Sequence, residues 1–101
     1  TMQRAEDVAA SYGESIRRAI ERHKHYPRAA RLRRIQGLVT VAFTVAADGS
    51  ISGLRAVGGA PSPLEQAALD AVRAVGKFAS IPRETGKTSL EFRIPMAFSL
   101  D

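Results

Sequence analysis

Residues 90–100, which read LEFRIPMAFSL, decide the fold of this chain. Apolar side chains alternate with the remaining side chains along this stretch without a break. The apolar members are Leu90, Phe92, Ile94, Met96, Phe98 and Leu100, and between them stand Glu91, Arg93, Pro95, Ala97 and Ser99. A period of two residues predicts a β-strand with one face in a hydrophobic core.

Pro95 adds a second prediction about this strand. Proline has no N–H to donate, so within a sheet it is tolerated where the missing donor points away from any partner strand. Residues 90–100 are therefore expected at an edge of the sheet. A long edge strand is either an aggregation hazard or a docking site for a strand of another chain.

The composition is that of one small domain covering residues 1–101. The chain is 45% hydrophobic and has no cysteine, so neither disulfides nor thiolate metal sites support it. No apolar run approaches the ~20 residues of a membrane span. The chain opens at Thr1 with a polar helix and is expected to be a piece of a longer protein. Residues 1–11 are interpreted as a helical extension or a linker remnant.

Two helices are predicted in the first third of the chain. Residues 3–24 have the apolar spacing of an amphipathic helix. Pro27 ends this helix, because the residue before a proline is driven out of the α region. Residues 28–35 then form a short second helix, for which Gly37 is expected to be the C-terminal cap.

A β-hairpin is predicted next. Residues 38–47 are rich in β-branched side chains, and Asp48-Gly49 is a strong signal for a tight turn. Residues 51–57 form the returning strand. Its apolar phase slips at Gly53, which predicts a β-bulge there.

A third helix follows the hairpin. Residues 62–65 read SPLE, with Ser62 as the expected N-cap, and Gly76 ends the helix. Residues 79–88 form a loop to the last strand. This order predicts an α+β fold with a three-stranded antiparallel-type sheet and helices on one face. A right-handed crossover places the strands in the spatial order second, first, third.

Side chains suited to catalysis or metal binding are sparse. His23 and His25 are the two histidines, and a spacing of two residues points them apart on a helix. No thiol or carboxylate cluster lies near them, so no metal, cofactor or catalytic site is predicted. The chain is therefore not expected to be an enzyme.

Basic residues are concentrated in residues 17–34, where eight of them stand against Glu21 alone. This segment carries a net charge of +7 in a chain of net charge +5. One interpretation is a solvated basic face. The other is a binding surface for nucleic acid, anionic lipid or an acidic protein.

A set of short motifs, in order and correctly spaced, resembles the C-terminal domain of TonB energy transducers, including the related TolA kind. The match covers about residues 12–100. The motifs are YP at 26–27, IQGLV at 35–39, FTV at 43–45, DGSI at 48–51, SPL at 62–64, AAL at 67–69, AV at 71–72, KF at 77–78 and IPMAFSL at 94–100.

The resemblance implies a function in the periplasm of a Gram-negative bacterium. Domains of this family are tethered to an inner-membrane helix that works with a proton-driven motor of the ExbB and ExbD type. They bind the TonB box, a short peptide of an outer-membrane TonB-dependent transporter, by strand addition to the last strand. Pulling on that peptide admits iron siderophores, haem or cobalamin.

The resemblance and Pro95 together predict which residues bind the partner. Alternate residues of a strand point their N–H and C=O groups in opposite directions. If Pro95 faces the open edge, so do the backbone groups of Glu91, Arg93, Ala97 and Ser99. Phe92, Ile94 and Met96 then pair inward within the same strand. His23, Tyr26, Pro27 and Arg93 are the candidates for side-chain contacts.

Alternatives stay open for two of these side chains and for the function. Tyr26 is otherwise an aromatic at the core edge with its hydroxyl in water, and Arg93 a solvated residue that protects the edge. The rival functions are a TolA-like envelope scaffold, a nucleic-acid-binding module of residues 17–34, and a strand-exchanged homodimer in which another copy satisfies the exposed edge.

Overall fold

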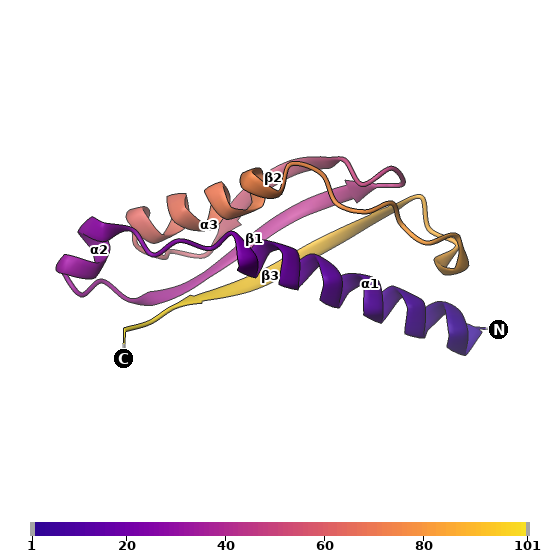
Figure 1. The fold of residues 1–101 in the computed structure, drawn as a ribbon, viewed down its shortest axis with the longest axis horizontal. Coiled ribbons are helices and arrows are strands. Elements are labelled where there is room, and N and C mark those ends of the chain that lie inside the picture. Colours follow the sequence, from indigo (N-terminus) through magenta and orange to yellow (C-terminus); the bar gives the residue numbers. More distant parts are fainter. Residues whose placement is uncertain (1, 101) are drawn as a thin grey trace.

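A three-stranded antiparallel sheet is the centre of the fold (Figure 1). The structure is a computed structural model that describes residues 2–100. Its strand order is β2-β1-β3, which confirms the predicted order. The elements, in chain order, are α1 (Met2–Arg22), α2 (Arg28–Leu32), β1 (Gly37–Ala46), β2 (Ile51–Val57), α3 (Ser62–Val75), the 3₁₀ turn η1 (Arg83–Thr85) and β3 (Ser89–Phe98).

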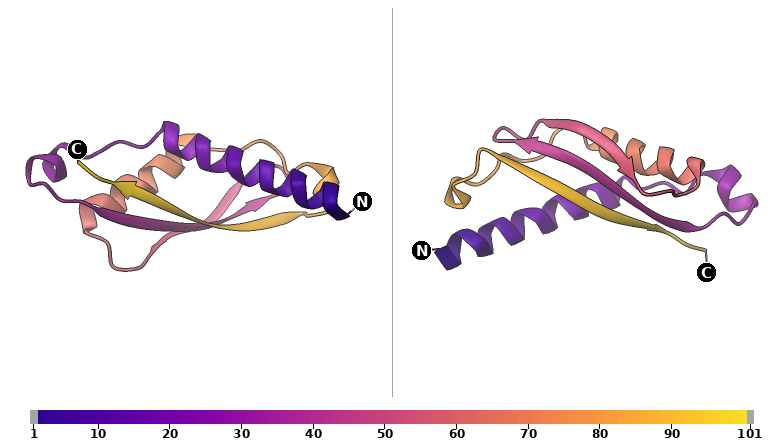
Figure 2. Two further views of the ribbon diagram at one scale, coloured as in Figure 1. Left: turned by 90° about the horizontal axis from the view of Figure 1, so that it is seen from below. Right: turned by 180° about the vertical axis from the view of Figure 1, so that it is seen from behind.

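The hydrophobic core lies between one face of the sheet and the helices α1 and α3. Both helices lie on the same side of the sheet (Figure 2), with α1 against β3 and α3 against β1 and β2. The period-two apolar residues of β1 are fully buried because that face is turned to the helices. The core side chains are Val39, Val41, Phe43 and Val45 of β1, Tyr12, Ile16 and Ile20 of α1, Leu64, Ala68, Ala71 and Val72 of α3, and Ile94, Met96 and Phe98 of β3.

The first turns of α1 extend along the molecule, which measures 50 × 24 × 22 Å. They pack beside η1 rather than over the sheet (Figure 1). The Tyr12 hydroxyl donates a hydrogen bond of 2.6 Å to the Ala79 carbonyl, which ties α1 to the loop before η1. Burial raises the pKa of Tyr12. Thr1 lies outside the described residues, and the interpretation of residues 1–11 as an extension stays a prediction.

The hairpin turn between β1 and β2 fits closely against the segment that follows α3. Gly49 has φ +92°, and a Cβ atom there would lie 1.9 Å from the Phe78 carbonyl oxygen. The Phe78 N–H donates to the Gly49 carbonyl at 3.0 Å, and the Ile81 N–H donates to the Ala47 carbonyl at 3.0 Å. The predicted tight turn at Asp48-Gly49 is therefore also a packing site.

The predicted bulge in β2 is confirmed. Ala42 is opposite Arg55 and Thr44 is opposite Ser52, so three steps along β2 match two steps along β1. The extra residue lies next to Gly53, whose φ is +64°.

Two predicted helix caps were wrong. Gly37 is the first residue of β1, and α2 ends earlier because Arg34 adopts φ +54°. The Ile35 N–H then donates to the Ala30 carbonyl at 2.8 Å. This C-terminal cap, with Arg34 in the left-handed conformation, satisfies the carbonyl without a glycine. At α3, Pro61 is the N-cap and Ser62 is the first helical residue. Gly76 ends α3 as predicted.

Candidate functional site: the open edge of β3

β3 lies at an edge of the sheet and pairs with β1 along its whole length. The register runs from Ser89 opposite Ala46 to Phe98 opposite Gly37. Within residues 2–100 the other side of β3 has no strand partner. Figure 2 shows β3, in yellow, as the outer strand in the view from behind. The predicted edge position is confirmed.

Contacts at the end of β3 show which backbone groups point outward. The Leu100 N–H donates to the Gln36 side-chain oxygen at 2.8 Å, and Gln36 directly precedes β1. The Ala97 carbonyl instead accepts from the Lys24 ammonium at 2.7 Å. Because backbone directions repeat every two residues, even-numbered positions face β1 and odd-numbered positions, Pro95 included, face the open edge.

The side chains of β3 divide in the same alternation. Ile94 and Met96 are buried in the core, and Phe92 is half-buried against the rings of Tyr12 and Phe43 at centroid distances of 6.3 and 5.7 Å. Their side chains hold the strand against the helices. The side chains of the predicted outward set are exposed on the opposite face of the sheet: Glu91, Arg93, Pro95, Ala97 and Ser99.

The connection between α1 and α2 lies beside the C-terminal end of β3. Tyr26 packs edge-to-face on Phe98, with ring centroids 5.8 Å apart, and its hydroxyl donates to the Ile35 carbonyl. That hydroxyl is therefore engaged within the domain, contrary to the alternative in which it reaches water. The Arg31 guanidinium lies over the Tyr26 ring at 5.6 Å. Pro27 is half-buried just before α2.

The two histidines do not point apart on a helix as predicted, because α1 ends at Arg22. His23 and His25 both line a groove between the α1–α2 connection and α3, across from Ala67 and Asp70. The His23 Nδ1 lies 2.9 Å from the Ala19 carbonyl oxygen. Among residues 2–100, no three side chains of metal-ligating type gather at one place.

Lys24 is a site residue that the sequence reasoning missed. Besides its bond to Ala97, its ammonium lies 2.8 Å from a carboxylate oxygen of Glu21 and 5.5 Å from the centre of the Phe98 ring. The Lys24 side chain is 27% exposed to solvent. In the sequence Lys24 is one member of a basic run, and nothing in the run indicates a contact with a residue 73 positions away.

The basic segment is exposed and partly paired. The Glu14 carboxylate contacts Arg17 at 2.6 Å and Arg18 at 3.3 Å. The hydrogen bond from Arg17 is the main reason that the pKa of Glu14 is lowered. Such exposed pairs contribute little to stability. Part of the positive charge in residues 17–34 is therefore balanced on the helix itself.

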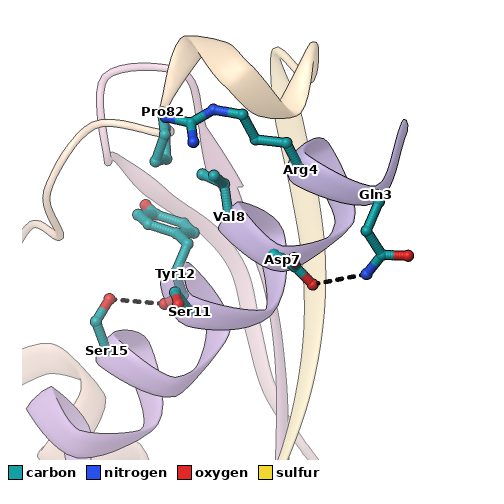
Figure 3. Close-up of a pocket in the computed structure, with 8 residues that line it drawn as sticks. All are labelled: Gln3, Arg4, Asp7, Val8, Ser11, Tyr12, Ser15 and Pro82. Carbon is teal, nitrogen blue, oxygen red and sulfur yellow. Dashed lines mark hydrogen bonds between the residues drawn. The ribbon is translucent and has the colours of Figure 1, made fainter. Parts of the chain in front are cut away.

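A second groove runs between the first half of α1 and Pro82 (Figure 3). Its lining is ordinary helix surface: the Gln3 amide donates to Asp7 at 3.0 Å, and the Ser15 hydroxyl donates to the Tyr12 carbonyl at 2.7 Å. No buried side-chain polar atom of the described residues lacks a hydrogen-bond partner. This groove has no feature that indicates a ligand.

Comparisons with known proteins agree with this geometry. Residues 22–100 match the family model described as Gram-negative bacterial TonB protein C-terminal. Protein TonB of Haemophilus influenzae is 48% identical over 71 residues, covering 66% of this chain and 26% of that protein. Protein TonB of Helicobacter pylori is 36% identical over 94 residues, covering 92% of this chain and 32% of that protein.

A solved structure shows the same fold. The solution NMR structure of the Helicobacter pylori TonB C-terminal domain superposes with a TM-score of 0.78 at 28% identity, covering all of this chain and 95% of that one.

This chain spans between a quarter and a third of the length of the two curated relatives named above. In residues 2–100 no helix combines the length and the apolar character that crossing a bilayer requires. By its sequence match and its fold, the chain belongs to the family of Gram-negative bacterial TonB C-terminal domains.

Proposed function

We propose that this domain binds a short extended peptide, the TonB box of an outer-membrane TonB-dependent transporter, by strand addition to β3. The observation that carries the proposal is the open edge of β3, with its odd-numbered backbone groups turned outward. An added strand pairs with Glu91, Arg93, Ala97 and Ser99 and leaves one gap in the donor ladder, at Pro95.

Family membership supports the rest of the proposal. The domain acts in the periplasm, tethered to the inner membrane by a preceding segment and driven by a motor of the ExbB and ExbD type. It transmits force and performs no catalysis. The transporter selects the nutrient, whether siderophore, haem or cobalamin, because backbone pairing is largely indifferent to the side chains of the bound peptide.

The mechanics of strand addition suit a reversible coupler. Each backbone hydrogen bond contributes only about 1 kcal/mol net, because it replaces a bond to water. Binding at rest is therefore weak. When the peptide is pulled along β3, all of the bonds are loaded together in shear, so a weak complex can still transmit force. The buried side chains of Ile94 and Met96 anchor β3 itself against this load.

The test is an NMR titration of the ¹⁵N-labelled domain with peptides that carry the TonB box of TonB-dependent transporters. We expect the largest amide shifts at Glu91, Arg93, Ala97 and Ser99. The matched controls are peptides N-methylated at alternate positions. Methylation of the set that faces β3 should abolish binding, and methylation of the other set should leave it intact.

Other outcomes would contradict the proposal. Shifts confined to residues 17–34 with a steep loss of affinity in salt would indicate nucleic-acid binding. Shifts of β3 caused by envelope proteins but by no transporter peptide would indicate a TolA-like scaffold. Shifts of β3 that depend on protein concentration alone, together with a rising molar mass, would indicate a homodimer.

A further inference from the structure

The Lys24 ammonium occupies an acceptor that strand addition requires. Its bond to the Ala97 carbonyl, at 2.7 Å, uses a backbone group on the open edge. The same ammonium lies 5.5 Å from the centre of the Phe98 ring and 2.8 Å from a carboxylate oxygen of Glu21. The ammonium thus makes three contacts within the domain. We call this contact the Lys24 cap.

An incoming strand competes with the Lys24 cap for the Ala97 carbonyl. When the N–H of the added residue takes the carbonyl, the ammonium loses this acceptor and keeps its contacts with Glu21 and the Phe98 ring. A partly buried cation that loses a hydrogen bond is destabilised unless a new acceptor replaces the old one. A carboxylate of the added peptide, at the end that lies beside Ala97, is the best replacement because it also carries the opposite charge.

We propose that Lys24 is a specificity-determining residue, which favours peptides with an acidic side chain beside the C-terminal end of β3. The inference rests on the proposed strand addition. Lys24 disfavours a neutral strand because its ammonium occupies the Ala97 carbonyl. When an acidic strand binds, the ammonium moves away from that carbonyl and pairs with the new carboxylate.

The probe is a set of eight-residue peptides of alternating Thr and Val with blocked ends, so that terminal charges do not interfere. One Glu is placed at each position in turn, and each peptide has a twin with Gln at the same position. Dissociation constants come from the shifts of the β3 amides. For the native domain we expect Glu to be preferred over Gln by about three-fold at the positions beside Ala97, the size of a partly exposed ion pair.

Two variants separate the Lys24 cap from general electrostatics. In Lys24→Met the Glu preference should fall to about one-fold, and the Gln twins should bind more tightly, since the carbonyl is free. Lys87→Met removes the same charge just before β3 begins, about 30 Å along the strand from Ala97. In Lys87→Met the Glu preference should be unchanged. In the free domain, the Ala97 carbonyl ¹³C signal should move in Lys24→Met and stay in Lys87→Met.

The outcomes distinguish the inference from the proposed function. If neither these peptides nor those from transporters perturb β3 in the native domain, strand addition is wrong and the inference falls with it. If peptides bind β3 but show no Glu preference, or a preference that Lys24→Met leaves intact, the inference alone is overturned. An Ala97 carbonyl signal that ignores Lys24→Met would also overturn it.

Discussion

The two edges of the sheet are built differently, and the difference indicates which one is suited to a partner. β2 has seven residues and a bulge at Gly53, and the Arg55 guanidinium donates to the Gly53 carbonyl at 2.9 Å. β3 has ten residues in continuous register with β1. A bulge and a charged side chain are common protections of an edge against pairing. β2 therefore has both protections. β3 also carries exposed charges, Glu91 and Arg93, but it has no bulge and keeps a regular backbone on which Lys24 caps one carbonyl.

The largest expected effect tests the direction of the backbone groups of β3. Ile94→Pro removes a donor that faces β1 and a buried side chain, so we expect the free energy of unfolding to fall by more than about 4 kcal/mol. Arg93→Pro removes a donor that faces the open edge. Its stability should change by less than about 1 kcal/mol, while binding of strand-adding peptides should be lost. Chemical denaturation and peptide titration measure the two effects.

Alanine variants at the same positions isolate the backbone contribution. Arg93→Ala keeps the N–H and should bind peptide at near-native affinity, apart from a small side-chain contribution. Ile94→Ala measures the cost of the lost side chain alone. If Arg93→Pro bound peptide as well as Arg93→Ala, the edge of β3 would not be the binding site.

The next effect concerns the turn that joins β1 to the β2 edge. In Gly49→Ala the new Cβ would overlap the Phe78 carbonyl oxygen, and φ +92° is unfavourable for alanine. We expect a loss of about 3 kcal/mol or more in the free energy of unfolding. Gly58→Ala is the matched control: its φ is +91°, but nothing lies within 4 Å of its added Cβ. It should cost only the backbone strain, about 1–2 kcal/mol. Equal costs would show that the contact with Phe78 is unimportant.

A smaller effect tests whether the bulge protects the β2 edge. Deleting Gly53 removes the extra residue and restores a regular register with β1. Ile51 and Leu54, which pack against the core on either side of the bulge, would then stand two positions apart and still face the helices. We expect stability within about 1 kcal/mol of native and a raised tendency to self-associate. Sedimentation at increasing concentration measures it, with Arg55→Ala as a companion that keeps the bulge. A monomeric deletion variant would contradict the protective role.

The sheet could be predicted from the sequence because its signals are local. The alternation in residues 90–100, Pro95, the Asp48-Gly49 turn and the phase slip at Gly53 each depend on neighbours a few positions away. These signals predict the strands, and the right-handed crossover through the third helix predicts their order and both edges. The bounds of β2 were also correct, at Ile51–Val57.

The contacts around the site could not be predicted in the same way. The Lys24 cap joins residues 73 positions apart, and whether a lysine in a basic run reaches a carbonyl depends on where two elements meet. The end of α2 was misjudged because Arg34 adopts a left-handed conformation that glycine favours. Tyr26 is a candidate from the sequence, but its hydroxyl bond to the Ile35 carbonyl depends on the tertiary fold.

The smallest effect is a pH dependence located in the turn beside β2. The Ser50 hydroxyl and N–H donate to one oxygen of Asp48, at 2.6 and 3.0 Å, and the Lys77 ammonium lies 3.8 Å from the other. The hydroxyl bond is the main cause that lowers the pKa of Asp48 below its usual value of 3.8. A lowered pKa in the folded state stabilises the fold above the unfolded-state pKa. That contribution is lost as the pH falls through the folded pKa. The free energy of unfolding, measured from pH 6 to 2, should therefore fall less steeply with acid in Asp48→Asn than in the native domain.

Glu14→Gln should independently reduce the loss of stability over the same pH range, because the pKa of Glu14 is lowered on α1, away from the turn. An acid limb that neither substitution changes would show that both carboxylates are equally solvated in the folded and unfolded states.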